Sequence, residues 1–192
     1  MDTFNLFFVI AIFCFMVVFL LKNGERKYRY QKTKMVDKFI QQHQIKVHKF
    51  YSGQYMDLIN DRHHRTIWFF VLEQQKLKYK KIPYEDLYYV AYKLDSHIIH
   101  TTSRSAQMKR EMLGGEGPPP EDIGPLVNKS NVKMVKEIYL TLIIDDWHAS
   151  TIDLLFVQHP FMADAKHIQD ADAKTWFEIF SSIIEDVEKT RA

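Results

Sequence analysis

Histidine and aspartate pairs are the residues of this chain whose types and spacing could support metal binding or acid–base catalysis. His63 and His64 are adjacent in a charged segment, and His97 and His100 lie three apart in a predicted strand. Side chains at i and i+3 of a strand point to opposite faces, so one metal ion cannot bind both directly. We therefore expect no metal site.

The best acid–base candidates are Asp145, Asp146 and His148, which lie together in a short turn. A charged hairpin tip has the same composition. The chain contains no Gly-x-Ser-x-Gly segment, no phosphate-binding loop and no His-Glu-x-x-His segment, which are the motifs that would identify a nucleophile or a cofactor site. The sequence therefore predicts no catalytic residue and no cofactor, and we expect that the chain is not an enzyme.

Basic side chains are concentrated around one predicted β-hairpin. Clustered lysine and arginine attract phosphate groups, and lysines are also typical of a solvated strand edge. Both interpretations stay open at this point. The possible contacts to a lipid headgroup or a protein partner are Arg62, Arg65, Lys76, Lys78, Lys80 and Lys81.

Alternating apolar residues predict the strands that would position these side chains. Residues 65–73 are apolar on both faces, which indicates a central strand, and residues 76–84 alternate apolar residues with lysine, which indicates an edge strand. Residues 86–95 and 97–102 predict one or two further strands. Residues 135–146 and 150–158 alternate in the same way around a short turn, so we expect them to form an antiparallel hairpin.

The C-terminal segment predicts an amphipathic helix that packs on this sheet. It contains no glycine or proline after Pro160, and its apolar residues recur at helical spacing. These residues are Trp176, Ile179, Phe180, Ile183 and Val187. A segment rich in glycine and proline, at about residues 103–131, separates the two groups of strands and predicts a mobile loop, whose role in function the sequence leaves open.

An apolar run at the N-terminus predicts a membrane anchor. Between Phe4 and Leu21 only Asn5 is polar, and a helix of that length spans about 27 Å, close to the thickness of a bilayer core. We expect a transmembrane anchor at 1–22, a basic juxtamembrane helical stalk at 23–48 and a folded domain at 49–192. The basic flank is assigned to Lys22, Arg26, Lys27, Arg29, Lys32 and Lys34.

The distribution of charge predicts topology and limits the partners. The excess of basic residues after the apolar run places the C-terminal part in the cytoplasm and the N-terminus outside, as in a single-pass protein of the inner or plasma membrane. The whole chain has a formal net charge of +2, and the basic flank accounts for this excess. The nearly neutral remainder argues against nucleic acid as a partner.

Two stretches resemble a family of uncharacterised bacterial membrane-anchored proteins with a pleckstrin-homology-like domain. These stretches are TIWFFVLEQQKLKYKKIPYEDLYYVAYKLD and the later segments LTLIIDD, IDLLFV and DADAKTWFEIFSSII. The resemblance implies an α+β chain in which an antiparallel β-sandwich or open barrel is capped by the C-terminal helix. It brings no catalytic residues.

The function that we expect is a membrane-anchored binding or scaffold module. It would recruit a protein, or a lipid headgroup, at the bilayer, and it could form a homo-oligomer through the anchor. Two alternatives remain open: a structural subunit of a secretion or conjugation machine, and a membrane-acting effector in conflict with phages or plasmids.

Overall fold

The computed structural model describes residues 16, 26–104, 132, 134–146, 151–165 and 170–191. The chain divides into two compact units. The first contains residues up to Ile45 together with Leu72–Leu77, and the second contains Lys46–Val71 and Lys78–Ala192. The candidate site described below lies entirely in the second unit.

The first unit is built from a helix over residues 26–42 and the turn of one hairpin. The Tyr28 hydroxyl donates a hydrogen bond to the Leu72 carbonyl oxygen at 2.9 Å. Gln74 and Gln75, in the hairpin turn, have φ values of 48° and 64°, which lie in the left-handed region typical of tight hairpin turns. Lys32 and Val36 of the helix are buried. This helix is therefore packed against other residues over part of its surface, unlike a free stalk.

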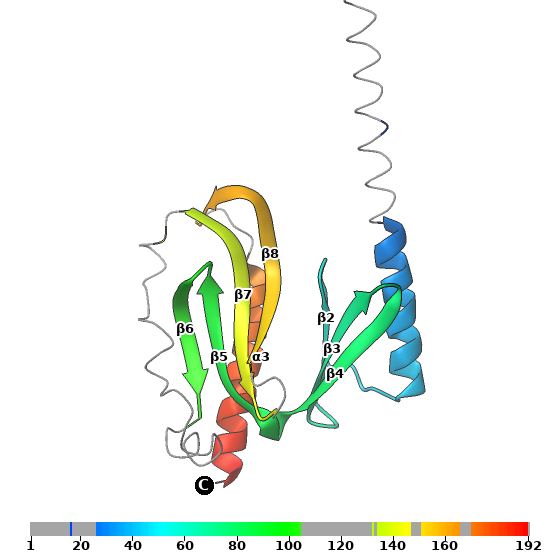
Figure 1. Cartoon of the computed structure of the whole chain (residues 1–192). Helices are drawn as coiled ribbons and strands as arrows, with labels where there is room; N and C mark the ends of the chain where they lie inside the picture. Colours follow the sequence, from blue (N-terminus) through cyan, green and yellow to red (C-terminus); the bar gives the residue numbers. More distant parts are fainter. Residues whose placement is uncertain are drawn as a thin grey trace, which may run out of the picture. The chain divides into compact units, whose positions relative to one another are not determined.

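Two four-stranded sheets contain all the strands of the described residues (Figure 1). The first has the order β1-β2-β3-β4, with β1 Lys49–Ser52, β2 Asp57–Asp61, β3 Thr66–Glu73 and β4 Lys76–Pro83. The second has the order β6-β5-β7-β8, with β5 Leu87–Leu94, β6 His97–Ser103, β7 Met134–Ile144 and β8 Thr151–Asp164. A short 3-10 helix, η1 (Tyr84–Asp86), connects β4 to β5.

Helix α3 (Ala171–Arg191) packs against β5, β6 and β7 of the second sheet (Figure 1). The core of the second unit joins side chains from both sheets to this helix. Its members include Leu58 and Phe69 from the first sheet, Leu140 from the second, and Trp176 and Phe180 from α3. Because one apolar cluster unites the three layers, the first sheet, the second sheet and α3 hold each other in place in this unit.

The spacing of apolar residues in the sequence predicted several of these elements correctly. β3 is an interior strand and β4 is an edge strand of the first sheet. β7 and β8 pair antiparallel, with Leu140 opposite Leu154. The C-terminal segment forms α3, and four of the five residues of its apolar stripe are buried, whereas Ile179 is half-buried. The predicted loop at 103–131 lies outside the described residues except for Ser103, which ends β6, and Arg104.

The predicted fold class, with a transmembrane helix and a stalk at the N-terminus, is wrong. The described fold consists of two helices and two antiparallel sheets, and none of the described helices is long and apolar enough to cross a bilayer. The prediction of a single-pass membrane protein is corrected by the same finding. The apolar run at 1–22, from which both predictions came, lies outside the described residues except for Met16.

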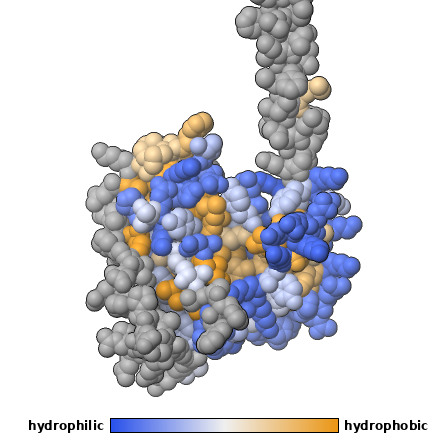
Figure 2. Space-filling view, in the orientation of Figure 1, coloured by the Kyte–Doolittle hydropathy of each residue, from blue (hydrophilic) through white to orange (hydrophobic). Residues whose placement is uncertain are grey.

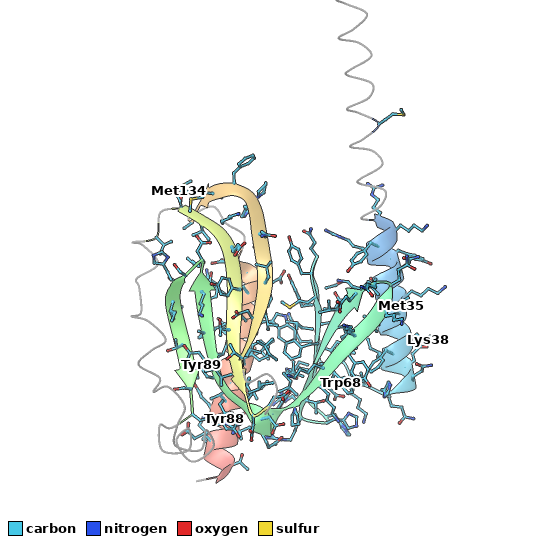
Figure 3. All side chains as sticks on the ribbon, viewed as in Figure 1. Met35, Lys38, Trp68, Tyr88, Tyr89 and Met134 are labelled. Atoms are coloured by element: carbon cyan, nitrogen blue, oxygen red, sulfur yellow. The ribbon has the colours of Figure 1, made fainter. Side chains whose placement is uncertain are left out.

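Several large apolar side chains of the second unit are exposed, and three of them lie at the start of β7 and near the end of β8. Met134, Phe161 and Met162 are 47 %, 82 % and 56 % exposed. Figure 3 shows Met134 at the start of β7, and Figure 2 shows apolar surface at this end of the second sheet. None of these three side chains lines the polar groove described next.

Candidate functional site

A polar groove of about 400 Å³ lies between α3 and the strands β1 and β2. One wall comes from the first sheet and its β2–β3 turn, the other from α3, and the floor includes η1. Its volume falls within the range of small-ligand sites in proteins. The lining residues are His48, Lys49, Asn60, Arg62, Tyr84, Thr175, Glu178, Ile179, Ser182, Ile183 and Asp186.

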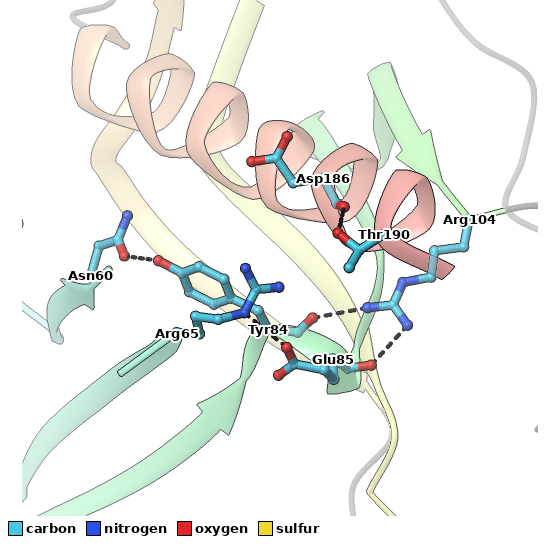
Figure 4. Close-up of polar contacts among 7 residues, drawn as sticks. All are labelled: Asn60, Arg65, Tyr84, Glu85, Arg104, Asp186 and Thr190. Atoms are coloured by element: carbon cyan, nitrogen blue, oxygen red, sulfur yellow. Dashed lines mark hydrogen bonds and ion pairs between the residues drawn. The ribbon is translucent and has the colours of Figure 1, made fainter. Parts of the chain in front are cut away.

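Tyr84 forms the buried floor of this groove. Its hydroxyl donates a short hydrogen bond to the Asn60 side-chain oxygen (Figure 4). Its backbone nitrogen donates to the Arg65 carbonyl oxygen at 2.9 Å. Burial raises the pKa of Tyr84, and the charges of Arg62 and Arg65 act in the opposite direction. The buried hydroxyl of Tyr84 is therefore held in place by Asn60 and offers a fixed polar group at the floor.

Two arginines hold η1 and so fix the position of this floor (Figure 4). Arg104 is 2 % exposed and donates to the carbonyl oxygens of Glu85 at 2.7 Å and Tyr84 at 2.9 Å. Arg65 donates to the Glu85 carboxylate at 3.0 Å, and its guanidinium lies 5.4 Å from the centre of the Tyr84 ring. Charge-assisted bonds of this kind are among the strongest polar contacts in proteins, so the floor is pre-organised.

The sheet wall depends on the buried carboxylate of Asp61. This carboxylate accepts hydrogen bonds from the backbone nitrogens of Lys46 and His64 at 3.2 and 3.1 Å, and it contacts the His64 ring nitrogen at 2.7 Å. Burial favours the neutral acid, but the bonds from His64 and Lys46 prevail and lower the pKa of Asp61. Because Asp61 directly precedes Arg62, the same bonds fix the turn that carries Arg62 to the groove.

The helix wall is one polar stripe along α3. Thr175, Glu178, Ser182 and Asp186 recur at intervals of three or four residues, so they share one side of the helix. The start of α3 is anchored by the Tyr92 hydroxyl, which donates to the Asp170 carboxylate at 2.7 Å. A rigidly anchored helix presents this polar stripe in a defined position.

The charges of the two walls are opposite and do not neutralise each other by direct pairing. Lys49 and Arg62 are exposed on the sheet wall, and Glu178 and Asp186 are exposed on the helix wall. Within the described part of the chain, none of these four side chains forms an ion pair. Four unpaired charges around one cavity are free to bind a charged ligand.

The six basic residues predicted as possible contacts do not form one site. Arg62 lies in the groove and Arg65 lies beneath it. Lys80 pairs with Asp146 at 2.6 Å, and the Lys81 ammonium lies 5.4 Å from the Trp68 ring centre on β3. Lys76 and Lys78 are exposed on β4. The structure thus brings only the two arginines to the candidate site.

The basic residues predicted to flank a membrane lie mostly on the first helix. Lys22 is outside the described residues, whereas Arg26, Lys27, Arg29 and Lys34 are exposed on the helix over residues 26–42. Lys32 is 1 % exposed, which is not expected of a side chain that contacts lipid headgroups. The assignment followed from the predicted anchor, and nothing in the fold adds support to it.

The residues first considered for catalysis are dispersed. His64 contacts Asp61, Asp145 lies 3.5 Å from the Tyr88 hydroxyl, and Asp146 pairs with Lys80. His148 lies outside the described residues. Among the residues that the structure describes, no three histidine, cysteine or carboxylate side chains are grouped as metal ligands.

Sequence reasoning missed Lys49, Asn60, Tyr84 and the two carboxylates of the helix wall. The available signal was the placement of Glu178 and Asp186 eight residues apart along the border of the apolar stripe of α3. That spacing places both on one side of the helix, but only the fold shows what lies opposite.

Comparisons with known proteins return no match. No family model matches the chain, and neither a curated protein nor a solved structure is significantly similar to it. The resemblance to pleckstrin-homology-like proteins therefore stays a prediction, and the function must be argued from the groove.

Proposed function

We propose that this chain is a binding domain, not an enzyme, and that it recruits a protein partner by holding an extended segment of that partner in the polar groove. The observation that carries the proposal is a set of four charged side chains around one cavity, none of which forms an ion pair among the described residues, above a floor held by hydrogen bonds. Rigid sites bind with less loss of conformational entropy than flexible ones.

The shape of the groove favours an extended peptide over a compact ligand. The lining residues of α3 run from Thr175 to Asp186, which is about three helical turns or about 16 Å. An extended chain rises about 3.3 Å per residue, so five residues match this length. β1 lies at the edge of its sheet beside the groove, and edge strands offer backbone groups to an added segment.

The experiment is selection of binders from a random nonapeptide library, using the full chain. Ser182→Trp places a large side chain in the groove, whereas Glu185→Trp places the same side chain on α3 at an exposed residue outside the groove. We expect Ser182→Trp to abolish binding of the selected peptides and Glu185→Trp to leave it intact. Selected peptides that bind both variants equally, or a selection that yields no binder, would refute the proposal.

A further inference from the structure

The spacing of the unpaired charges in the groove specifies the kind of segment that fits it. We infer that the groove selects an extended peptide with a defined order of charges: two basic residues four positions apart, with two acidic residues between them. This inference rests on the proposed function, because it names the ligand of the same groove.

The helix wall sets the spacing of the basic residues. Glu178 and Asp186 are eight residues apart on α3, which corresponds to about 12 Å along the helix axis. In an extended segment, positions i and i+4 lie on the same face and are about 13 Å apart. Lysine or arginine at these two positions therefore reaches both carboxylates at once.

The sheet wall sets the spacing of the acidic residues. Lys49 is paired with Asn60 across the β1–β2 ladder, and Arg62 follows Asn60 by two residues. Strand geometry puts the two cationic positions on the order of 8 Å apart. Positions i+1 and i+3 of an extended segment face away from i and i+4 and are about 7 Å apart. Glutamate or aspartate at these positions matches the sheet wall.

The centre of the helix wall determines which kind of residue fits at the middle position, i+2, of the bound segment. Ser182 lies four residues from Glu178 and four from Asp186, so it is opposite position i+2 of the segment. Ile179 and Ile183 line the cavity around it. A small residue with a hydroxyl group fits there, because it can exchange a hydrogen bond with Ser182 without displacing the segment from the walls.

The order of the signs matters as much as their number. In a segment with the signs exchanged, the two bases at i+1 and i+3 are only about 7 Å apart, so both must splay outward to reach carboxylates about 12 Å apart. Turning the segment about its own axis does not correct this mismatch. The groove therefore distinguishes two peptides of similar composition and net charge, which general electrostatic attraction cannot do.

The test compares three synthetic nonapeptides with common neutral flanks, measured by fluorescence anisotropy with the full chain. Their central residues are Lys-Glu-Ser-Glu-Lys, the sign-exchanged Glu-Lys-Ser-Lys-Glu, and the block arrangement Lys-Lys-Ser-Glu-Glu. Exposed ion pairs are individually weak, so we expect the first peptide to bind about three- to tenfold more tightly than the other two. We also expect this preference to decrease at high salt.

Single charge reversals show which wall of the groove produces the preference for the first peptide. Glu178→Lys and Asp186→Lys should each remove the preference for the first peptide, whereas Glu185→Lys, which reverses a charge on the same helix outside the groove, should retain it. If peptides selected from the random library bind the groove but the three designed peptides bind equally, the charge pattern is refuted and the peptide-binding function stands. If blocking the groove with Ser182→Trp affects no peptide, both are refuted.

Discussion

One side of α3 is apolar and buried in the core, whereas the side that faces the groove is polar and exposed. Trp176, Phe180 and Val187 are at most 2 % exposed and belong to the core. Glu178, Ser182 and Asp186 are exposed on the groove side, and the two carboxylates have no ion-pair partner in the described part of the chain. Different residues of α3 therefore stabilise the fold and form the proposed binding surface.

The same contrast separates two arginines of the site. Arg104 is buried and donates to two carbonyl oxygens of η1, so its hydrogen-bonding capacity is used by the fold. Arg62 is exposed in the groove without an ion pair among the described residues. The comparison teaches that a charged residue indicates a binding site here only when the fold does not already use it.

The largest expected change in stability comes from a test that replaces one residue on each side of α3. Trp176→Ala removes a fully buried indole from the core and should lower the free energy of unfolding by about 3–5 kcal/mol. Glu178→Ala should change it by less than about 0.5 kcal/mol, because this side chain is exposed. Urea denaturation followed by circular dichroism measures both. Equal losses would show that the groove side also stabilises the fold.

The two arginines provide the next largest effect. Arg104→Met keeps much of the volume but leaves the carbonyl oxygens of Tyr84 and Glu85 without these donors, so we expect a loss of about 2–3 kcal/mol in the free energy of unfolding. Arg62→Met should leave stability nearly unchanged and weaken binding of the selected peptides. A stable Arg104→Met variant would contradict the role of this residue in holding the floor.

The contrast also explains which parts of the molecule could be predicted from the sequence. β3, β7, β8 and α3 have long and regular apolar periods, and these periods depend on local geometry that the sequence displays directly. β1 and β2 were missed. β1 has only four residues, and β2 buries Asp57, Asn60 and Asp61, whose polarity conceals a strand.

The groove could not be predicted because it depends on tertiary proximity. Its walls come from β1 and α3, which are more than 100 residues apart in the chain. Arg104 lies within the segment at about 103–131 that was predicted to be a mobile loop, so nothing local indicated that it is buried beneath the site. The membrane prediction failed differently, because it rested on the apolar composition of a segment that, apart from Met16, lies outside the described residues.

A smaller effect should come from the carboxylate that supports the sheet wall. Since the pKa of Asp61 is lowered in the folded chain, its contribution to stability is present above the unfolded-state pKa and is lost as the pH falls through the folded-state pKa. Asp61→Asn should therefore be less stable than the original chain by about 1–2 kcal/mol at neutral pH. The difference should shrink below about pH 4.

Urea denaturation at a series of pH values measures this difference. The control is Glu185→Gln, which alters an exposed carboxylate of α3 that does not line the groove. If Asp61→Asn reduced stability by the same amount at every pH, the ionised carboxylate would not be the group that organises the turn. In that case the position of Arg62 would need another explanation.

The smallest expected effect is the sharpest test of the groove side of α3. Ser182 is exposed midway along the helix, and alanine has a higher helix propensity than serine. Ser182→Ala should therefore raise the free energy of unfolding by up to about 0.5 kcal/mol while weakening binding of a peptide with a hydroxyl group at its middle position. Only a binding role for Ser182 predicts a variant that is more stable and binds the peptide more weakly. If Ser182 instead served the fold, replacing it would lower the free energy of unfolding of the protein.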